Sequence, residues 1–241
     1  MNRVYIIPAH LKSKRFPNKL IQKFGDKRII DIVIEKTKTL LGDVVLATED
    51  DLLIDIAKEH KIQAFKMGEV GCGSERAYHF YKANSQYDYY ITIPADEVAL
   101  DMKEVSKALK DNHNNITTLY CDFYNQHDLV SPLSCKIVST IHDKALYFSR
   151  SVIPIHKQKN DLIYDDLSIY KKHVGVFIFS KSFLSSSSKV WGKSRLATIE
   201  GLEQNRFLEY GYDIHLRKIK HIGFGIDQPE QIEQLLNRIQ K

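Results

Sequence analysis

The sequence predicts an α/β fold in which a mainly parallel central sheet is flanked by helices. Short runs rich in β-branched and aromatic residues alternate with segments whose apolar residues recur at helical spacing. A strand that continues through a helix into a second strand makes a right-handed crossover, so this alternation favours parallel pairing with helices on both faces. The sequence shows no internal repeat and no linker, and we therefore expect residues 1–241 to form a single domain.

The elements follow from local composition and periodicity. Strands are expected at residues 4–7, 44–47, 89–93, 117–120, 134–138, 174–179 and 214–219. Helices are expected at residues 29–41, 52–60, 198–210 and 229–239. The apolar stripe of the first helix consists of Ile30, Val33, Ile34, Thr37 and Leu41. Asp50 and Asp51 stand where a helix N-cap is expected, and Gly25 and Gly42 mark turns.

The region from residue 122 to residue 172 is less regular, and we expect a small excursion from the main sheet there. Strand patterns near residues 134–140 and 145–148 favour a hairpin, used for substrate contact or for dimerisation. A polar stretch at residues 157–166 follows without a clear period.

Composition excludes several classes of protein. The net charge of +5 is mild and the basic residues are spread along the chain, which indicates an anionic ligand only weakly and does not indicate nucleic acid. Cys72, Cys121 and Cys135 form no C-x-x-C pair, and an odd number fits reduced thiols better than a disulfide framework. No apolar run approaches the roughly 18 residues that a membrane span needs. We therefore expect a cytoplasmic protein without membrane insertion.

A cationic loop, residues 9–19, leaves the end of the first predicted strand. In an open parallel sheet, ligands bind beyond the carboxyl ends of the strands. The small Ala9 lets backbone N–H groups approach a ligand, and Arg15 and Lys19 can present two cations to a polyphosphate. A solvated surface loop explains the same residues equally simply, because neither the P-loop nor the dinucleotide-binding glycine motif is present.

Two aspartates are candidate ligands for Mg²⁺. The predicted strand at residues 89–93 delivers Asp96 and Glu97 to the same edge of the sheet, where a carboxylate can hold Mg²⁺ together with phosphate oxygens and water. Asp227 precedes a helix whose first turn contains Pro229 and Glu230. Each aspartate has two explanations, a metal ligand or a helix cap.

Seven segments, taken in order along the chain, carry a more specific signal. They are IPAHLKSKRFPNK at residues 7–19, VVLATED at 44–50, CGSER at 72–76, KALYFSRSVIPI at 144–155, HVGVFIF at 173–179, EGLEQNRFLEYGYDI at 200–214 and GIDQPEQIE at 225–233. These segments resemble the signatures of the 3-deoxy-manno-octulosonate cytidylyltransferases, also called CMP-Kdo synthetases, and of their sialate-activating relatives. The segment at residues 144–155 is similar to a pattern that is specific to the Kdo branch.

The resemblance implies a fold, an activity and an assembly. The fold is that of the nucleotide-diphospho-sugar transferases, which is Rossmann-like, and the enzymes are usually homodimers. They couple CTP to an acidic ulosonic sugar, Kdo or a related ulosonate, with Mg²⁺ as cofactor. The products are a CMP-sugar for lipopolysaccharide or capsule synthesis and pyrophosphate.

The resemblance also implies roles for individual residues. The catalytic set is Arg15, Lys19, Asp96 and Asp227, of which the two aspartates are the metal ligands. The nucleotide-binding set is Pro8, Ala9, His10, Arg15, Lys19, Gly73, Ser74 and Arg76. The sugar-binding set is Arg150, His173, Glu203 and Gln204. For His173, which starts a predicted strand, a core histidine is an equally good explanation.

Three departures from the family pattern fall at informative places. His10 stands where the family has arginine, Pro94 and Ala95 replace a glutamine and a glycine, and Ala197 replaces a carboxylate near the sugar site. Because Asp96 and Asp227 are retained, we expect an active enzyme.

The departures also define the alternatives. These are a modified ulosonate, another small acidic acceptor, or a catalytically silent relative that binds nucleotide. A glycosyltransferase would be expected to carry a D-x-D motif at the strand end, which is absent, and no nucleic-acid recognition motif is visible.

Overall fold

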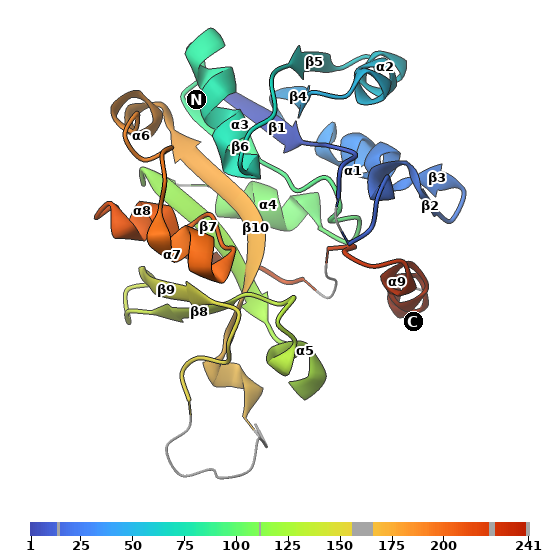
Figure 1. Cartoon of the computed structure of the whole chain (residues 1–241). Coiled ribbons are helices and arrows are strands. Elements are labelled where there is room, and N and C mark those ends of the chain that lie inside the picture. The colour runs from blue at the N-terminus through green and yellow to red at the C-terminus, as the bar shows by residue number, and fades with distance from the viewer. Residues whose placement is uncertain (14, 111, 156–165, 222–224, 240–241) are drawn as a thin grey trace.

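The computed structural model describes the whole chain except residues 14, 111, 156–165, 222–224 and 240–241. A central sheet runs through the molecule with the strand order β11-β7-β10-β6-β1-β4-β5 (Figure 1). The strands of this path are β1 (Arg3–Pro8), β4 (Asp43–Thr48), β5 (Gln63–Lys66), β6 (Tyr89–Thr92), β7 (Ile116–Asp122), β10 (Lys171–Ser180) and β11 (His215–Lys218). All neighbouring pairs are parallel except those of β10, which runs antiparallel to β6 and β7. The predicted α/β fold with a mainly parallel sheet is confirmed.

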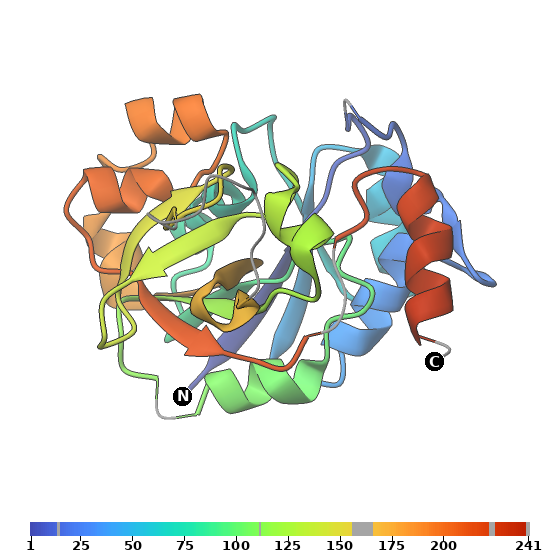
Figure 2. The ribbon, with the colours of Figure 1, turned by 90° about the horizontal axis from the view of Figure 1, so that it is seen from below.

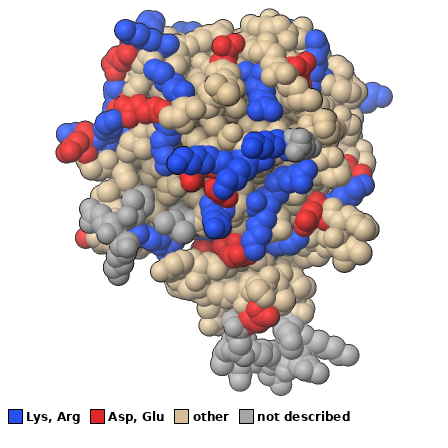
Figure 3. Space-filling model, turned by 180° about the vertical axis from the view of Figure 1, so that it is seen from behind, with Lys and Arg blue, Asp and Glu red and all other residues tan. Residues whose placement is uncertain are grey.

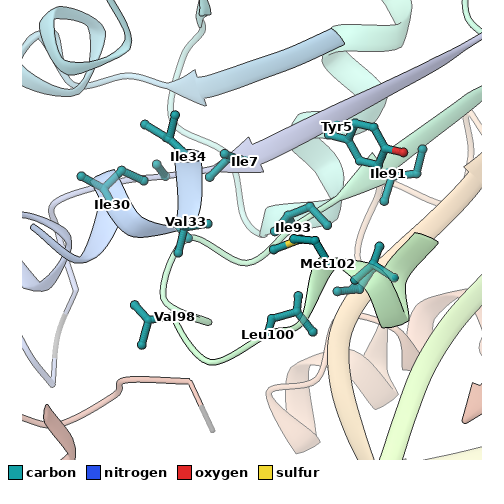
Figure 4. Packing of buried hydrophobic residues seen from close by; sticks show 14 of the residues in the cluster. Tyr5, Ile7, Ile30, Val33, Ile34, Ile91, Ile93, Val98, Leu100 and Met102 are labelled. Atoms are coloured by element: carbon teal, nitrogen blue, oxygen red, sulfur yellow. The ribbon is translucent and has the colours of Figure 1, made fainter. Parts of the chain in front are cut away.

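Alternation along β1 explains why both faces of the sheet are covered. Tyr5 and Ile7 belong to a buried apolar cluster with α1 (Ile29–Thr37) and α4 (Met102–Ala108), part of which Figure 4 shows. Val4 and Ile6 point to the opposite face and belong to a second cluster, which includes residues of α3 (Gly73–Ala83) and α6 (Lys181–Ser186). A strand buried on both faces is apolar at successive positions, as the sequence of β1 is.

Two predicted helices differ from those observed. The first ends at Thr37, so that Leu41, which was predicted to be on its apolar stripe, lies beyond the helix and is 89% exposed. The single helix predicted at residues 198–210 is two short helices, α7 (Arg195–Glu200) and α8 (Asn205–Glu209). Gly201, with φ +62°, ends the first of them, because glycine adopts the left-handed conformation without strain.

The other elements confirm or extend the prediction. Helices α2 (Asp51–Glu59) and α9 (Glu230–Ile239) occupy the predicted places. Several observed elements were not predicted from the sequence: α3, α4, α6, β5, the short helices α5 (Gln126–Val130), η1 (Lys19–Ile21) and η2 (Leu167–Ile169), and the hairpin of β2 (Lys23–Phe24) and β3 (Lys27–Arg28). At the predicted turn Gly42, with φ +146°, a Cβ atom would lie 2.6 Å from the carbonyl oxygen of Arg3.

The excursion at residues 122–172 contains the predicted hairpin. Strands β8 (Lys136–Ser139) and β9 (Ala145–Ser149) pair antiparallel, and β8 also pairs with β10. The view from below shows these strands next to the short helices α7 and α8 (Figure 2). Of the polar stretch predicted at residues 157–166, all but Asp166 lies outside the described residues.

The surface agrees with the mild net charge. Figure 3 shows a band of Lys and Arg side chains across the rear face, with Asp and Glu side chains beside it, so this face carries charges of both signs. Within the part of the chain that the structure describes, every helix is too short or too polar to cross a bilayer.

Candidate functional site

Three adjoining cavities lie at the edge of the sheet where β1 and β6 end. The central cavity, of about 500 Å³, contains most of the predicted site residues: Pro8, His10, Lys19, Gly73, Ser74, Arg76, Asp96, Arg150, His173, Glu203 and Gln204. The basic cavity, of about 570 Å³, shares His10, Lys19 and Arg76 with it. The α9 cavity, of about 410 Å³, shares Asp96, Arg150 and His173 with the central cavity and Arg15 and Asp227 with the basic cavity. The three cavities therefore adjoin one another and share parts of their walls.

Lys19 lies at the centre of this site. Its ammonium group donates a hydrogen bond to Asp96 Oδ2 and another, of 2.9 Å, to the carbonyl oxygen of Ile226, and it lies 3.6 Å from Asp227 Oδ1. Arg15 Nη2 donates to the same Asp227 oxygen at 2.7 Å. The four residues predicted to be catalytic, which are up to 212 positions apart in sequence, are therefore brought together as two cations and two carboxylates.

Burial and neighbouring charges shift the pKa of both Lys19 and Asp96. Desolvation lowers the pKa of Lys19, but the charge of Asp96, the hydrogen bond to it and the charge of Asp227 outweigh this effect, and the net pKa is raised. Desolvation raises the pKa of Asp96, against the opposing attraction of Lys19 and with a further contribution from the neighbouring Glu97. Lys19 is thus held as a cation, and its charge opposes the effect of burial on the pKa of Asp96.

The helix-cap explanation of the two aspartates is wrong. Helix α9 is preceded by Asp227, but the backbone N–H groups of Asp227 and Gln228 donate to the side-chain oxygen of Gln231, at 2.6 and 2.8 Å. Helix α4, which follows Asp96, is capped by Asp101, whose carboxylate accepts from the N–H of Lys103 at 2.8 Å. Both aspartates are therefore available to the cavities.

The donor set fits Mg²⁺. Asp96 and Asp227 offer hard carboxylate oxygens, and both lie within 4 Å of one lysine nitrogen, so a small cation near that point could reach both. The described residues contain no group of three or more His, Cys, Asp or Glu side chains arranged around one metal position. One or two carboxylates completed by phosphate oxygens and water is the usual way in which proteins bind Mg²⁺ with a nucleotide.

The cationic loop is anchored by a hydrogen bond to the Asp50 side chain. Asp50 stands at the predicted N-cap position of α2, but its carboxylate makes no cap and instead accepts from the N–H of Leu11 at 2.8 Å. Ala9 is a predicted nucleotide-binding residue whose small side chain was expected to let backbone N–H groups approach a ligand, but its own N–H group is already bonded. Ala9 is 1% exposed within the core, and its N–H donates to Ala47 O at 3.0 Å, because the residue continues the pairing of β1 with β4.

The start of α3 joins the predicted nucleotide and sugar residues. Ser74 donates to Glu203 Oε2 from its backbone nitrogen at 3.0 Å and from its hydroxyl at 2.6 Å. A Cβ atom on Gly73 would lie 3.4 Å from Pro8 and 3.7 Å from Glu203, so the chain passes closely between them.

Arg76 is a buried cation on the same helix. It is 3% exposed, and its Nη2 atom lies 2.6 Å from Glu49 Oε2, a partner that the sequence analysis did not identify. Its Nη1 atom has no hydrogen-bond partner among the described residues. A buried N–H group without a partner costs free energy, so this atom is a good donor to a ligand in the cavity that it lines.

Arg150 differs from the expectation of a free carboxylate-binding fork. Its guanidinium donates to four backbone carbonyls, those of Pro132, Leu133, Glu200 and Gly201, at 3.0 to 3.3 Å. The buried Lys136, also missed from sequence, fixes the segment from the other side by donating to the carbonyl oxygen of Arg150 at 2.9 Å.

His173 and Gln204 lie next to each other in the wall of the central cavity. His173 Nε2 lies 2.8 Å from the Thr118 hydroxyl, and its Nδ1 atom is 3.5 Å from the side-chain nitrogen of Gln204. Desolvation lowers the pKa of His173 to about 3, although the charge of Glu97 acts in the opposite direction. The imidazole is therefore neutral at physiological pH, lines the cavity and packs in the fold, so the two explanations of this residue are compatible.

The three departures lie in different places. His10 is exposed and lines both the central and the basic cavity. Pro94 and Ala95 line the central cavity beside Asp96. Ala197 is 8% exposed within α7 and does not line any of the three cavities.

Comparison with known proteins places these features in context. Residues 4–219 match the sequence model of the cytidylyltransferase family. The 3-deoxy-manno-octulosonate cytidylyltransferase of Parabacteroides distasonis is 32% identical, over 98% of this chain and 97% of that protein. The protein of the same name from Flavobacterium johnsoniae is 31% identical, over 97% of each chain.

Solved structures of nucleotide-transferring enzymes have a similar fold. The structure of CMP:2-keto-3-deoxy-manno-octonic acid synthetase complexed with CTP matches with a TM-score of 0.86 and 25% identity, over 100% of this chain and 99% of that one. The inositol-1-phosphate CTP transferase from T. maritima matches with a TM-score of 0.68 and 11% identity, over 100% of this chain and 97% of that one, a likeness of fold alone.

The neutral His173 predicts a specific pH dependence of stability. Below its ordinary pKa of 6.5, the unfolded chain binds a proton that the folded chain does not, so the free energy of unfolding falls as the pH is lowered towards 3. Between about pH 7 and about pH 5, wild type should lose about 1 to 2 kcal/mol more than His173→Gln, measured by urea unfolding. Equal pH dependence of the two proteins would contradict the assignment of a neutral histidine.

Proposed function

The chain belongs to the cytidylyltransferase family, in the branch of the 3-deoxy-manno-octulosonate cytidylyltransferases, and on that premise we propose that it couples CTP to an acidic ulosonic sugar and releases pyrophosphate. The observation that carries the proposal is the cluster of Arg15, Lys19, Asp96 and Asp227 at the junction of three cavities. Such a cluster combines fixed cations for a polyphosphate with carboxylates for a divalent metal.

The chemistry needs positioning and charge neutralisation. The anomeric hydroxyl of the sugar attacks the α-phosphorus of CTP and releases its proton to water as the new P–O bond forms. The bond between the α-phosphorus and the oxygen that bridges it to the β-phosphorus breaks, which releases pyrophosphate. No covalent enzyme intermediate is required. The barrier falls when the attacking and leaving oxygens are held in line and the phosphate charge is neutralised. Arg15 and Lys19 supply that neutralisation, and their carboxylate partners keep them in place before CTP binds.

We propose Mg²⁺ as the cofactor, held by Asp96 and Asp227. When bound, it would supply further neutralisation of the phosphate charge and a fixed geometry for the phosphate oxygens. The chain's own contribution is the placement of the two carboxylates. The Asp96 loop is bonded through its carbonyl oxygen to the N–H of Ile226 at 3.2 Å, which holds the two segments in register.

The remaining predicted residues divide the central cavity between the two substrates. Gly73, Ser74 and Arg76, at the start of α3, are proposed to contact the cytosine and its ribose, where a tight loop favours a pyrimidine over a larger purine. Arg150, His173, Glu203 and Gln204 line the same cavity and are proposed for the sugar. Because four of the five N–H groups of the Arg150 guanidinium already bind backbone carbonyls, we infer that Arg150 shapes the sugar pocket and offers its one remaining N–H group to the carboxylate.

A modified acceptor is the second candidate. His10 and Pro94 change both the basic and the central cavity relative to the family pattern, which supports a related ulosonate or another small acidic acceptor in place of unmodified Kdo. The products would serve lipopolysaccharide or capsule synthesis. A silent relative that binds nucleotide without turnover is the alternative of a different class.

Pyrophosphate release is the decisive assay. With CTP, Kdo and Mg²⁺ we expect turnover that falls at least about 100-fold in Asp96→Asn. The variant removes the negative charge of a proposed ligand of the Mg²⁺ that neutralises the reacting phosphates. Asp101→Asn, which alters only the cap of α4, is the matched control and should keep wild-type activity.

The outcomes separate the candidates. Turnover only with a modified ulosonate identifies the second candidate, and CTP binding without turnover on any acceptor identifies the silent relative. Equal activity of Asp96→Asn and wild type would overturn the proposed metal site.

We further propose that the protein is a cytoplasmic homodimer. The free thiols Cys72, Cys121 and Cys135 support a reducing compartment. Ile141 and Leu146 of the β8–β9 hairpin region and Ile199 of α7 support self-association, since they are 93%, 57% and 78% exposed. Light scattering should give twice the monomer mass, about 56 kDa against 27.9 kDa, and Ile141→Asp with Ile199→Asp should reduce it to the monomer. A wild-type monomer at micromolar concentration would contradict this proposal.

A further inference from the structure

We propose that Lys12 binds the terminal phosphates of CTP and supplies the cation that His10 does not. This inference rests on the proposed function and deepens it. Lys12 is not among the residues to which the family resemblance assigns a role. The structure places it on the wall of the basic cavity, with His10, Arg15, Lys19 and Arg76.

The other Lys and Arg side chains of the basic cavity lie closer to their carboxylate partners than Lys12 does to its own. Arg76 lies 2.6 Å from Glu49, Arg15 lies 2.7 Å from Asp227, and Lys19 is bound to Asp96. The partner of Lys12 is Glu69, whose Oε2 atom lies 3.6 Å from Lys12 Nζ, and the two side chains are 67% and 72% exposed. Solvent screens an ion pair as exposed as this one, so Lys12 can exchange its partner for a phosphate at little cost.

The backbone under Lys12 is fixed although its side chain is exposed. The N–H of Leu11 donates to Asp50 at 2.8 Å, and the carbonyl oxygen of Leu11 accepts from Ser13 and Asn18 at 3.0 Å each. Lys12 therefore stands between anchored residues, and only its side chain has to reorient. A charged group on a fixed backbone loses less entropy on binding than one on a mobile loop.

The position of Lys12 indicates which phosphates it reaches. It lines the basic cavity and not the central cavity, whereas Lys19 lines both. If the base and ribose occupy the central cavity beside Gly73 and Ser74, the chain of phosphates passes Lys19 and extends into the basic cavity. Lys12 then meets the β- and γ-phosphates, which carry most of the negative charge of CTP.

Glu69 is expected to affect CTP affinity in the direction opposite to Lys12. Its carboxylate faces the same cavity, so it competes with the phosphates for Lys12 and repels them. Removing its charge should strengthen CTP binding, whereas removing the charge of Lys12 should weaken it. A merely structural Lys12–Glu69 pair would make both substitutions act in the same direction.

The test compares equilibrium binding of CTP and CMP by calorimetry. Lys12→Gln should weaken CTP about tenfold and leave CMP within about twofold, because CMP lacks the terminal phosphates. Glu69→Gln should tighten CTP about threefold. His10→Arg in the Lys12→Gln background should restore much of the loss, since it returns a permanent cation to the loop. Lys27→Gln, which removes an exposed lysine paired with Glu35 away from the cavities, is the matched control and should change neither affinity.

The outcomes keep this inference separate from the proposed function. An unchanged affinity of Lys12→Gln for CTP, or an equal loss for CTP and CMP, overturns the role of Lys12 while wild type still binds CTP. Failure of the wild-type protein itself to bind CTP would overturn the proposed function, and with it this inference. Circular dichroism of each variant confirms that the fold is retained.

Discussion

The site depends on the ion pairs that the Lys19 ammonium group makes with the carboxylates of Asp96 and Asp227. One ammonium group joins three segments that are far apart in sequence: the loop after β1, the loop after β6 and the segment that precedes α9. Its side chain is 12% exposed and that of Asp96 is 22% exposed, so neither charge is well solvated. Removing one partner of such a pair leaves the other charge without compensation, which costs more than the pair itself contributes.

This arrangement prepares the site for the proposed reaction. Two carboxylates close to each other repel, and the positive charges of Lys19 and Arg15 offset this repulsion before any ligand is present. The same cations then face the cavities in which we place the triphosphate. In the ligand-free protein, the cations proposed to bind phosphate are therefore paired with the carboxylates proposed to bind the metal. When CTP and the metal bind, the cations exchange these carboxylates for phosphates, and the carboxylates exchange the cations for the metal.

Much of the fold could be predicted from the sequence because it rests on local patterns. Strand β1 is apolar at successive positions and α2 has a clear stripe, and both were predicted within a residue or two. Leu41 was assigned to a helix that ends before it, since periodicity alone does not mark where a helix stops. The break at Gly201 was missed for the same reason.

The site was predicted through the family resemblance, and geometry added what residue types cannot show. Nothing in the local sequence indicates that Asp50 anchors the loop instead of capping α2, or that Ala9 is paired within the sheet. Arg150 was identified as a residue of the sugar site, but its four carbonyl partners come from segments about 17 and 51 positions away, a contact set that only the folded chain defines.

A double-mutant cycle on the free energy of unfolding measures the interaction between Lys19 and Asp96. We expect Lys19→Met to destabilise the ligand-free protein by about 2 to 3 kcal/mol, because Asp96 and Asp227 then lose their shared cation. Adding Asp96→Asn should recover at least about 1.5 kcal/mol of that loss, a coupling characteristic of residues in direct contact. Additive effects of the two substitutions would show that Lys19 and Asp96 do not act as a pair, and would contradict the account.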